Sequence, residues 1–550
     1  MKRACSLFLA GLISTGLGTK AALAQPAPKP PTTAAAPRSP PPAQAPSPAP
    51  SAPSTASDPA ADARMRALEE RLTGVENRAR EAEKKAEENQ AALDKERTER
   101  EAVSAAVKKR AAEEAAAEQK KAEEEKGRAT DYAPSKVPFA FADFSWAPGN
   151  YGPPDHPFAQ GPFTGELRVD TAYHYSFNNP VDNTISGSSE VFRHNELQLT
   201  QMGIGGDFYY KGAHARLMTQ FGMYSTTTPR NDASPAKGQW RLDDAYRYIS
   251  EAYAGYHVDA LHGINIQAGI FMSYVGLWSY YNFDNWTYQP SYVSSNTPWF
   301  FNGARVQIFA NEHVKIEPWL VNGWQSYGKF NEAPGVGLQL LWRPTGYLTV
   351  LGNQYFGSDT LGLPGRLRVH TDDSIMVKYH DRPGAAFSKA AASLTVDAGC
   401  EWGGDGALHT ECGSQYFVGF MAYTRLWFAA DQLAFTAGGG AIKNPGRYLV
   451  LVPPINGATA FSGTPYFTAA PKDPFEAWDM QLTGDYLPTP NTIVRLEFNH
   501  RAANVPYFAG HGGVTPPGGN QGAPGSAVDG WTPDLVKSED RITAAFLLRL

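Results

Sequence analysis

The chain has 550 residues, a formal net charge of −6, 52 glycines and 12% aromatic residues. Three cysteines are too few for a disulfide scaffold or a cysteine-rich metal site, and the small negative charge gives no reason to expect nucleic acid as a partner. Beyond the N-terminus no apolar run reaches 18 residues, which excludes membrane-spanning helices.

Residues 1–24 have the composition of a secretory signal peptide. Lys2 and Arg3 give a positive start, Ser6–Gly18 an apolar segment, and Ala22–Ala24 a small-x-small cleavage site. We therefore expect the chain to be exported.

A spacer and a charged helix are expected next. Residues 25–61 consist almost wholly of Pro, Ala, Ser and Thr, which predicts a disordered spacer. Residues 62–127 are dense in charge, with 18 acidic and 16 basic residues up to Lys126. Apolar residues between Met65 and Val75 follow heptad spacing. The pattern predicts a helix that stands alone or forms a coiled coil joining copies of the chain into a homo-oligomer. Residues 128–164 are expected to be a linker.

From residue 165 to residue 550 the chain alternates apolar and polar positions. Trp478, Met480 and Leu482 alternate with Asp479 and Gln481, and this period of two places the two sets on opposite faces of a strand. The pattern predicts an all-β fold, a transmembrane antiparallel up-and-down β-barrel of sixteen strands. The expected strands are 165–177, 195–210, 213–224, 247–258, 262–272, 300–310, 313–321, 335–343, 346–356, 372–380, 386–398, 415–429, 432–441, 476–487, 491–501 and 539–550.

The connections between these strands alternate in length along the chain. Seven are tight, at 211–212, 259–261, 311–312, 344–345, 381–385, 430–431 and 488–490. The long ones lie near 178–194, 225–246, 273–299, 322–334, 357–371, 399–414, 442–475 and 502–538. A soluble sandwich has no reason for this alternation, whereas an outer-membrane barrel has short periplasmic turns and long external loops. We expect both termini and the charged helix in the periplasm.

Aromatic residues and the final strand agree with a membrane barrel. Tyr256, Trp319 and Trp342 lie near strand ends, where the two membrane interfaces would be. The alternating strand that ends at Leu550 resembles the terminal strand read by the barrel-assembly machinery. Outer-membrane lipid and that machinery are the expected partners.

Three motifs carry a resemblance to a known family. They are Phe139–Asn150, Ser279–Pro290 and Glu317–Trp324. Together with the strand pattern, they make the segment from Phe139 onward similar to the OmpL-like outer-membrane porins of the β-barrel porin 2 family. The resemblance implies an outer-membrane porin for small hydrophilic solutes or ions.

In such a barrel the strand phase also predicts which residues line the lumen. Charged side chains opposite the apolar set would be costly against lipid, so we expect them inside. The candidates contain more basic than acidic groups, which favours anion preference; mutual salt bridges that only stiffen the wall are an equal alternative. The candidates are Arg168, Arg216, Arg305, Lys315, Glu317, Arg343, Lys378, Arg425, Asp479, Arg495 and Glu497, together with Asp170, His214, Glu251 and Gln307.

The long connections contain aromatic-polar runs at 278–292, 299–302 and 507–519. Runs that fold inward would narrow the pore or contact a sugar-like or aromatic solute. We favour the alternative, in which they pack on one another as an external cap.

Motifs for catalysis, cofactors and metals give little signal. Gly438–Gly440 lacks the spacing of a phosphate-binding loop, and His409, Glu411 and Cys412 are too few for a zinc site. We expect no catalytic residue, no metal and no cofactor. Cys400 and Cys412 flank an external loop in an oxidising compartment, where we expect a disulfide, with free thiols as the alternative.

Two other functions remain open. An envelope protein could use the barrel only to anchor a periplasmic coiled-coil spacer. A barrel enzyme, such as an outer-membrane lipase or protease, would need a nucleophile and a base, which no local motif supplies.

Overall fold

The computed structural model describes most of the chain from residue 137 onward. The described stretches are 137–149, 157–188, 190–229, 232–278, 280–360, 363–406, 409–445, 475–519 and 530–550, with helical residues at 73–74, 80–81, 84–85, 90, 94–95, 97–98 and 109. The expected signal peptide and spacer lie outside the described residues.

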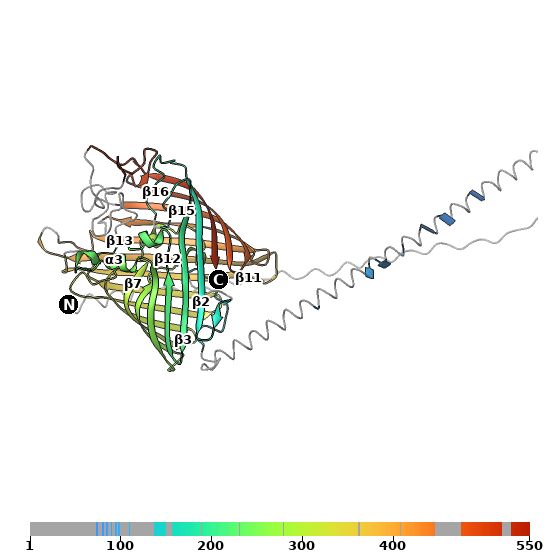
Figure 1. Cartoon of the computed structure of the whole chain (residues 1–550), viewed down its shortest axis with the longest axis horizontal. Coiled ribbons are helices and arrows are strands. Elements are labelled where there is room, and N and C mark those ends of the chain that lie inside the picture. Colours follow the sequence, from blue (N-terminus) through green and yellow to red (C-terminus); the bar gives the residue numbers. More distant parts are fainter. Residues whose placement is uncertain are drawn as a thin grey trace, which may run out of the picture. The chain divides into compact units, whose positions relative to one another are not determined.

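Long antiparallel strands make up the body of the described structure (Figure 1). They are β2 (Phe163–Ser176), β3 (Glu196–Tyr210), β4 (Ala213–Thr219), β5 (Ile249–Val258), β6 (Ile264–Met272), β7 (Phe300–Asn311), β8 (Val314–Val321), β9 (Gly335–Thr345), β10 (Leu348–Gly357), β11 (Arg366–Asp381), β12 (Phe387–Gly403), β13 (Tyr416–Phe428), β14 (Leu433–Asn444), β15 (Phe475–Thr489), β16 (Thr492–Ala503) and β19 (Ser538–Arg549).

These strands close into a ring. Each pairs with the next in sequence, and β19 pairs with β2 from Arg541 opposite Ser176 to Arg549 opposite Arg168. The expected sixteen-stranded antiparallel barrel is therefore confirmed within the described residues. A closed ring satisfies the backbone hydrogen bonds of every strand and leaves no free edge.

Some strand bounds differ from the expected ones. β4 ends at Thr219 rather than at 224, because the chain turns into a short helix at Tyr224. β11 begins at Arg366 rather than at 372, and β12 continues to Gly403 rather than ending at 398. The two strands pair along this added length, with Arg366 opposite Gly403.

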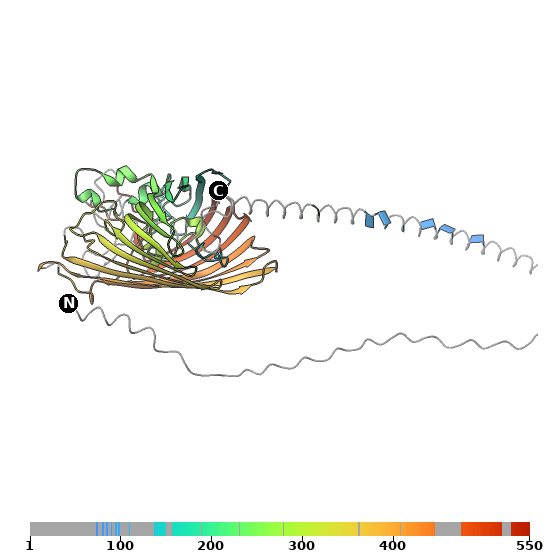
Figure 2. The same cartoon turned by 90° about the horizontal axis from the view of Figure 1, so that it is seen from below.

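The two ends of the barrel differ. The short-turn end carries tight connections such as Lys211–Gly212, and the long-loop end carries connections such as 177–195 and 273–299. Figure 2 shows the strands coloured yellow to orange as one long wall of the barrel. Short elements outside the main strands are β1 (Ala159–Gln160), α2 (Tyr224–Thr227), η3 (Ser234–Ala236), α3 (Leu242–Tyr246), η4 (Asn282–Asp284), α4 (Tyr292–Ser295), β17 (Phe508–Ala509) and β18 (Leu535–Val536).

Asp182 joins two of the long connections. Its carboxylate accepts the backbone N–H groups of Val514 at 2.8 Å, Thr515 at 2.7 Å and Thr184 at 3.1 Å. Burial raises the pKa of Asp182, but these hydrogen bonds outweigh burial and hold that pKa below its usual value. The run 507–519 thus packs on loop 177–195, while Tyr507 and Phe508 join a buried cluster with Tyr292 of the run 278–292. That the run forms an external cap stays a prediction.

The wall has two chemically different faces. On β15 the side chains of Trp478 and Leu482 point outward and are 49% and 52% exposed, whereas Asp479 and Gln481 between them are buried. The pattern repeats around the ring, with apolar side chains outside and polar ones inside. An apolar outer band with a polar interior is the arrangement of a barrel that spans a membrane.

The described residues between 73 and 109 are helical, and the hydroxyl of Thr98 donates to the carbonyl of Asp94 at 2.8 Å. Coiled-coil pairing of this segment stays a prediction. In the described part of the chain, no helix has both the length and the apolar composition needed to cross a membrane.

The outer band can be tested with one arginine placed at two depths. Leu496 is 60% exposed in the middle of β16, whereas Tyr486 lies close to a tight turn. We expect Leu496→Arg to lower the free energy of unfolding by about 2–4 kcal/mol, because the charge would face hydrocarbon. Tyr486→Arg should cost only about 0–1 kcal/mol near the interface. Urea unfolding from lipid vesicles measures both, and equal costs would contradict the assignment of depth.

Candidate functional site

The first eleven predicted lumen residues, from Arg168 to Glu497, all lie on the inner face of the wall. Eight are buried: Arg168, Glu317, Arg343, Lys378, Arg425, Asp479, Arg495 and Glu497. The other three, Arg216, Arg305 and Lys315, keep 12–15% of their side-chain surface exposed. Their surroundings divide the interior into three regions.

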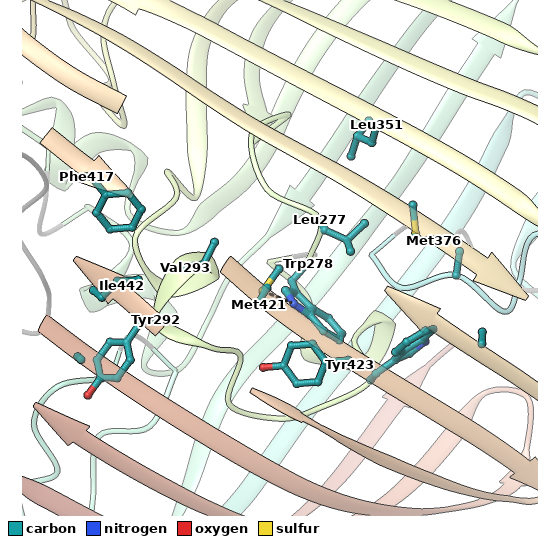
Figure 3. Close-up of a cluster of buried hydrophobic side chains, with 14 of the residues drawn as sticks. Leu277, Trp278, Tyr292, Val293, Leu351, Met376, Phe417, Met421, Tyr423 and Ile442 are labelled. Carbon is teal, nitrogen blue, oxygen red and sulfur yellow. Dashed lines mark hydrogen bonds between the residues drawn. The ribbon is translucent and has the colours of Figure 1, made fainter. Parts of the chain in front are cut away.

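The first region is built by the connection 273–299, which folds into the barrel. Tyr274 donates to the carbonyl of Gln354 on β10, while the backbone N–H of Tyr292 donates to Asp479 on β15. Figure 3 shows Trp278 and Val293 of this connection against Met421 of β13. Our preference for an external cap was wrong for the run 278–292. The reason is that the wall's buried charges bind its backbone groups.

Asp485 is the centre of these interactions. It forms ion pairs with Arg425 and Arg495, each at an N···O distance of 2.7 Å. The side chains of all three residues are at most 5% exposed. Arg495 also donates to the carbonyls of Asn285 and Thr287, at 2.7 and 2.8 Å. The guanidinium group thus links a wall carboxylate to the backbone of the loop.

Two carboxylates hold the following part of the loop. Glu497 accepts the backbone N–H groups of Tyr288 at 2.6 Å and Gln289 at 2.9 Å. Asp479 accepts those of Tyr292 at 2.8 Å and, from the neighbouring strand, Gly440 at 3.1 Å. Buried backbone donors need such acceptors, so the loop and the wall satisfy each other.

Residues 282–288, in the middle of the loop, are held by charged side chains of both signs. Asp284 in η4 pairs with Arg168 of β2 at 2.8 Å and also with Arg549 of β19. Asp170, another expected inner residue, accepts from Asn282 at 2.9 Å and from the hydroxyl of Tyr288 at 3.0 Å.

The second region is filled by residues 137–149, which we had placed in a linker. Phe144 and Trp146 are buried inside the barrel, and the backbone N–H of Phe139 donates to the carbonyl of Glu312 at the short-turn end. The segment meets the folded-in loop, because the indole N–H of Trp286 donates to the carbonyl of Trp146 at 3.2 Å.

Two lumen candidates lie under this segment. The Arg343 guanidinium lies over the rings of Phe139 and Phe144, at 4.9 and 4.3 Å from their centroids. Lys378 forms an ion pair with Asp381 at 2.5 Å, and its ammonium lies 5.9 Å from the ring of Trp146. Aromatic faces stabilise these cations in place of water.

The third region, along β3–β8, keeps contact with water. Arg216 binds Glu166 at 2.9 Å, Asp207 at 2.7 Å and Glu251 at 3.0 Å, and the Asp207 side chain is 52% exposed. Glu317 pairs with Lys315 at 2.7 Å and with Arg305 at 3.4 Å. His214 and Gln307, also expected inside, are only partly buried here.

Glycines occupy many inner positions of the same wall. Gly203 and Gly205 on β3 face the inner residues Arg168 and Glu166 across the strand pair. Gly255, Gly269 and Gly303 continue the inner row on β5, β6 and β7, with Gly269 directly opposite Gly303. A Cβ at Gly205, Gly255, Gly269 or Gly303 would lie within 2.3 Å of a carbonyl oxygen of the neighbouring strand, so glycine at these positions lets the backbones pack closely.

Several inner ionisable residues were not among our candidates. They include Glu166, Arg368, Asp372, Asp397, Glu401, Asp485, Arg501, Glu539, Arg541 and Arg549, all buried. The signal was present in the sequence, because each stands at an inward position of an alternating strand. A complete reading of strand phase would have included them.

The remaining candidates concern the long-loop end. Cys400 and Cys412 are joined by a disulfide with an S–S distance of 2.04 Å. Nearby, His409 and Glu411 contact each other at 2.7 Å and are exposed. Among the described residues, no group of three or more His, Cys, Asp or Glu side chains is placed to hold a metal ion.

A closed antiparallel ring, apolar outside and charged inside, defines a transmembrane β-barrel of the outer-membrane type. Residues 162–523 match the family model described as "Putative beta-barrel porin-2, OmpL-like". The chain therefore belongs to this family, as its motifs indicated, and is an outer-membrane barrel related to porins.

Solved outer-membrane structures resemble the chain at low sequence identity. An anion-selective porin from Comamonas acidovorans is 9% identical, with a TM-score of 0.42 over 70% of this chain and 99% of that one. OprB of Pseudomonas putida is 9% identical, with a TM-score of 0.39 over 70% and 94%. OmpT of Vibrio cholerae in its trimer form is 9% identical, with a TM-score of 0.38 over 70% and 99%. No curated protein matches the sequence.

The role of Asp485 can be tested by removing its carboxylate. Asp485→Ala leaves Arg425 and Arg495 without their shared anion, and we expect the free energy of unfolding to fall by about 3–5 kcal/mol. Asp207→Ala is the matched control, because Asp207 also pairs with an arginine but is exposed, and should cost about 0–1 kcal/mol. Urea unfolding measures both variants. A small effect at Asp485 would show that the loop is not held through this carboxylate.

Proposed function

We propose that the protein is a passive porin through which ions and small hydrophilic solutes diffuse along the inner face of β3–β8. The observation that carries this proposal is the third region of the lumen, where the ion-paired side chains of Arg216, Arg305 and Lys315 keep 12–15% of their surface exposed and Asp207 keeps 52%. A polar, water-bearing lumen inside an apolar outer band is what a diffusion porin requires.

The barrel's connections support an orientation. Outer-membrane barrels have short turns on the periplasmic side and long loops outside. On this rule the short-turn end faces the periplasm, and both termini lie there. Solute would enter past the long loops and leave beside Arg216 and Lys315.

The lumen is narrowed by two segments of the chain in this proposal. The connection 273–299 covers the inner face of β13–β16, and residues 137–149 cover inner residues of β9 and β11. Both are fixed by interactions with the wall. The passage is therefore set by the fold, and solute size is its main selection rule.

Charge selection should be weak in the unaltered protein. Each of the three exposed inner cations, Arg216, Arg305 and Lys315, already has a carboxylate partner. The expected basic excess is thus offset within the wall, which favours the salt-bridge alternative over a strong anion preference.

The first test measures single-channel conductance of the refolded protein in a planar bilayer. We expect stepwise openings, and a larger unit conductance in the double variant Phe144→Ala, Trp146→Ala, because the segment 137–149 would lose its anchors. Trp240→Ala is the control, since Trp240 is 84% exposed and should leave conductance unchanged. A folded, heat-modifiable barrel that never conducts would refute the porin proposal.

A second test concerns the charges of the lumen. Glu317→Gln removes the anion shared by Lys315 and Arg305, so the reversal potential in a salt gradient should shift toward anion preference. Asp207→Asn, which frees one face of Arg216, should shift it in the same direction but less, because Arg216 keeps two other carboxylates. No shift in either variant would place the conducting path elsewhere.

Deletion of residues 26–126 separates a porin from an envelope tether. A porin conducts without the spacer and the charged helix, whereas a tether loses its envelope phenotype although the barrel still folds.

A further inference from the structure

The outer face of the barrel, which is mostly apolar, contains a cluster of three polar side chains. It consists of Gln354 on β10 and of Thr371 and Asp373 on β11. The amide N–H of Gln354 donates to the hydroxyl of Thr371 at 2.6 Å, and that hydroxyl donates to the carboxylate of Asp373 at 2.8 Å. Gln354 and Asp373 are exposed on the same side as the outward Val369 and Ile375.

The depth of Asp373 makes the cluster unusual. Six residues toward the long-loop end, Leu367 pairs with the outward Trp402; six residues toward the short-turn end stands the exposed Tyr379. Aromatic residues of this kind sit at the two membrane interfaces. Asp373 therefore lies midway between the interfaces, where water and lipid headgroups do not reach.

The immediate neighbours of Asp373 give it no polar partner across the sheet. It pairs with Gly352 on β10 and with the outward Val396 on β12. The Asp373 carboxylate lies over Gly352, where an added Cβ would be 3.1 Å from Oδ1. A carboxylate facing hydrocarbon at this depth is unfavourable, so this part of the wall is better covered by protein than by lipid.

From these observations we infer that a second copy of this chain covers the wall at β10–β11, with the Gln354–Thr371–Asp373 clusters in contact. Two copies inserted in one direction are related by a two-fold axis parallel to the membrane normal, so equal depths meet and each cluster faces the same cluster of the other copy. The cluster is suited to contact with a copy of itself, because it offers both a hydrogen-bond donor and an acceptor. Gln354 keeps a second amide N–H, and Asp373 keeps a second carboxylate oxygen, so Gln354 can donate to Asp373 of the partner subunit.

This interface is independent of conduction and of the charged N-terminal helix. A coiled coil would join the chains by residues 62–127, whereas the proposed contact lies on the barrel wall. The two sources of association therefore give different results when the wall alone is altered.

The test uses the full mature protein in lipid nanodiscs, with its mass measured by native mass spectrometry and its fold checked by heat-modifiable mobility. We expect an oligomer whose dissociation constant rises by about tenfold or more in Asp373→Leu and also in Gln354→Ala, as expected when one buried polar contact of this kind is lost. Thr171→Leu, which removes an outward polar group on β2, is the matched control and should leave the dissociation constant unchanged.

Cross-linking locates the contact. Ile375→Cys, the next outward position on β11, should form a disulfide between copies, whereas Ile204→Cys on β3, eight strands away, should not. A monomeric wild-type protein would overturn the proposal and leave lipid or another protein as the cover. An oligomer that does not respond to Asp373→Leu and does not cross-link at position 375 would also overturn it, and would assign the association to the helix.

Discussion

A charge that is buried in the covered part of the barrel interior cannot reach bulk water, and it is costly unless it is paired. Asp485 shows the consequence most directly, because it lies between Arg425 and Arg495 with the side chains of all three almost completely buried. Arg495 has donors left over, and these are taken by carbonyls of residues 282–287. One carboxylate does not use all five N–H donors of a guanidinium group, so the remaining donors bind carbonyls of the loop. The inward course of the connection 273–299 follows from that requirement.

The same requirement explains why two distant segments meet in the lumen. Residues 137–149 cover Arg343 and Lys378 with aromatic rings, and the loop covers the charges of β13–β16. The segments touch where Trp286 binds the carbonyl of Trp146 and where the N–H of Gly149 binds the carbonyl of Asp284. Once these parts of the wall are sealed, β3–β8 is the part that keeps exposed inner charges. The proposed path therefore follows the part of the inner face that neither segment covers.

Strand phase was readable from the sequence, and loop direction was not. Alternation at Trp478–Leu482 predicts which side chains face outward, because a strand has a period of two whatever surrounds it. The alternating lengths of the connections then give the barrel and its sixteen strands. The run 278–292 has no period to interpret, and its aromatic and polar residues suit a cap as well as a plug. Its position depends on Asp479, Glu497 and Arg495, which lie roughly 200 residues away in sequence. The placement of Phe144 and Trp146 depends likewise on distant cations.

The pairing rule applies to the outside of the wall as well. Inside, buried cations such as Arg495 and Arg343 are compensated by a carboxylate, loop carbonyls or aromatic rings, and Glu497 accepts N–H groups of the loop. Outside, apolar side chains that face lipid need no such partner. The outward residues around Asp373 are of this kind, as Val369, Ile375 and Val396 show. Asp373 departs from these surroundings, because it is an outward carboxylate that accepts from the hydroxyl of Thr371. Within the chain the Thr371 hydroxyl donates to Asp373, and the proposed second copy would add a further donor to this carboxylate. A copy of the same wall brings the required amide donor at the required depth.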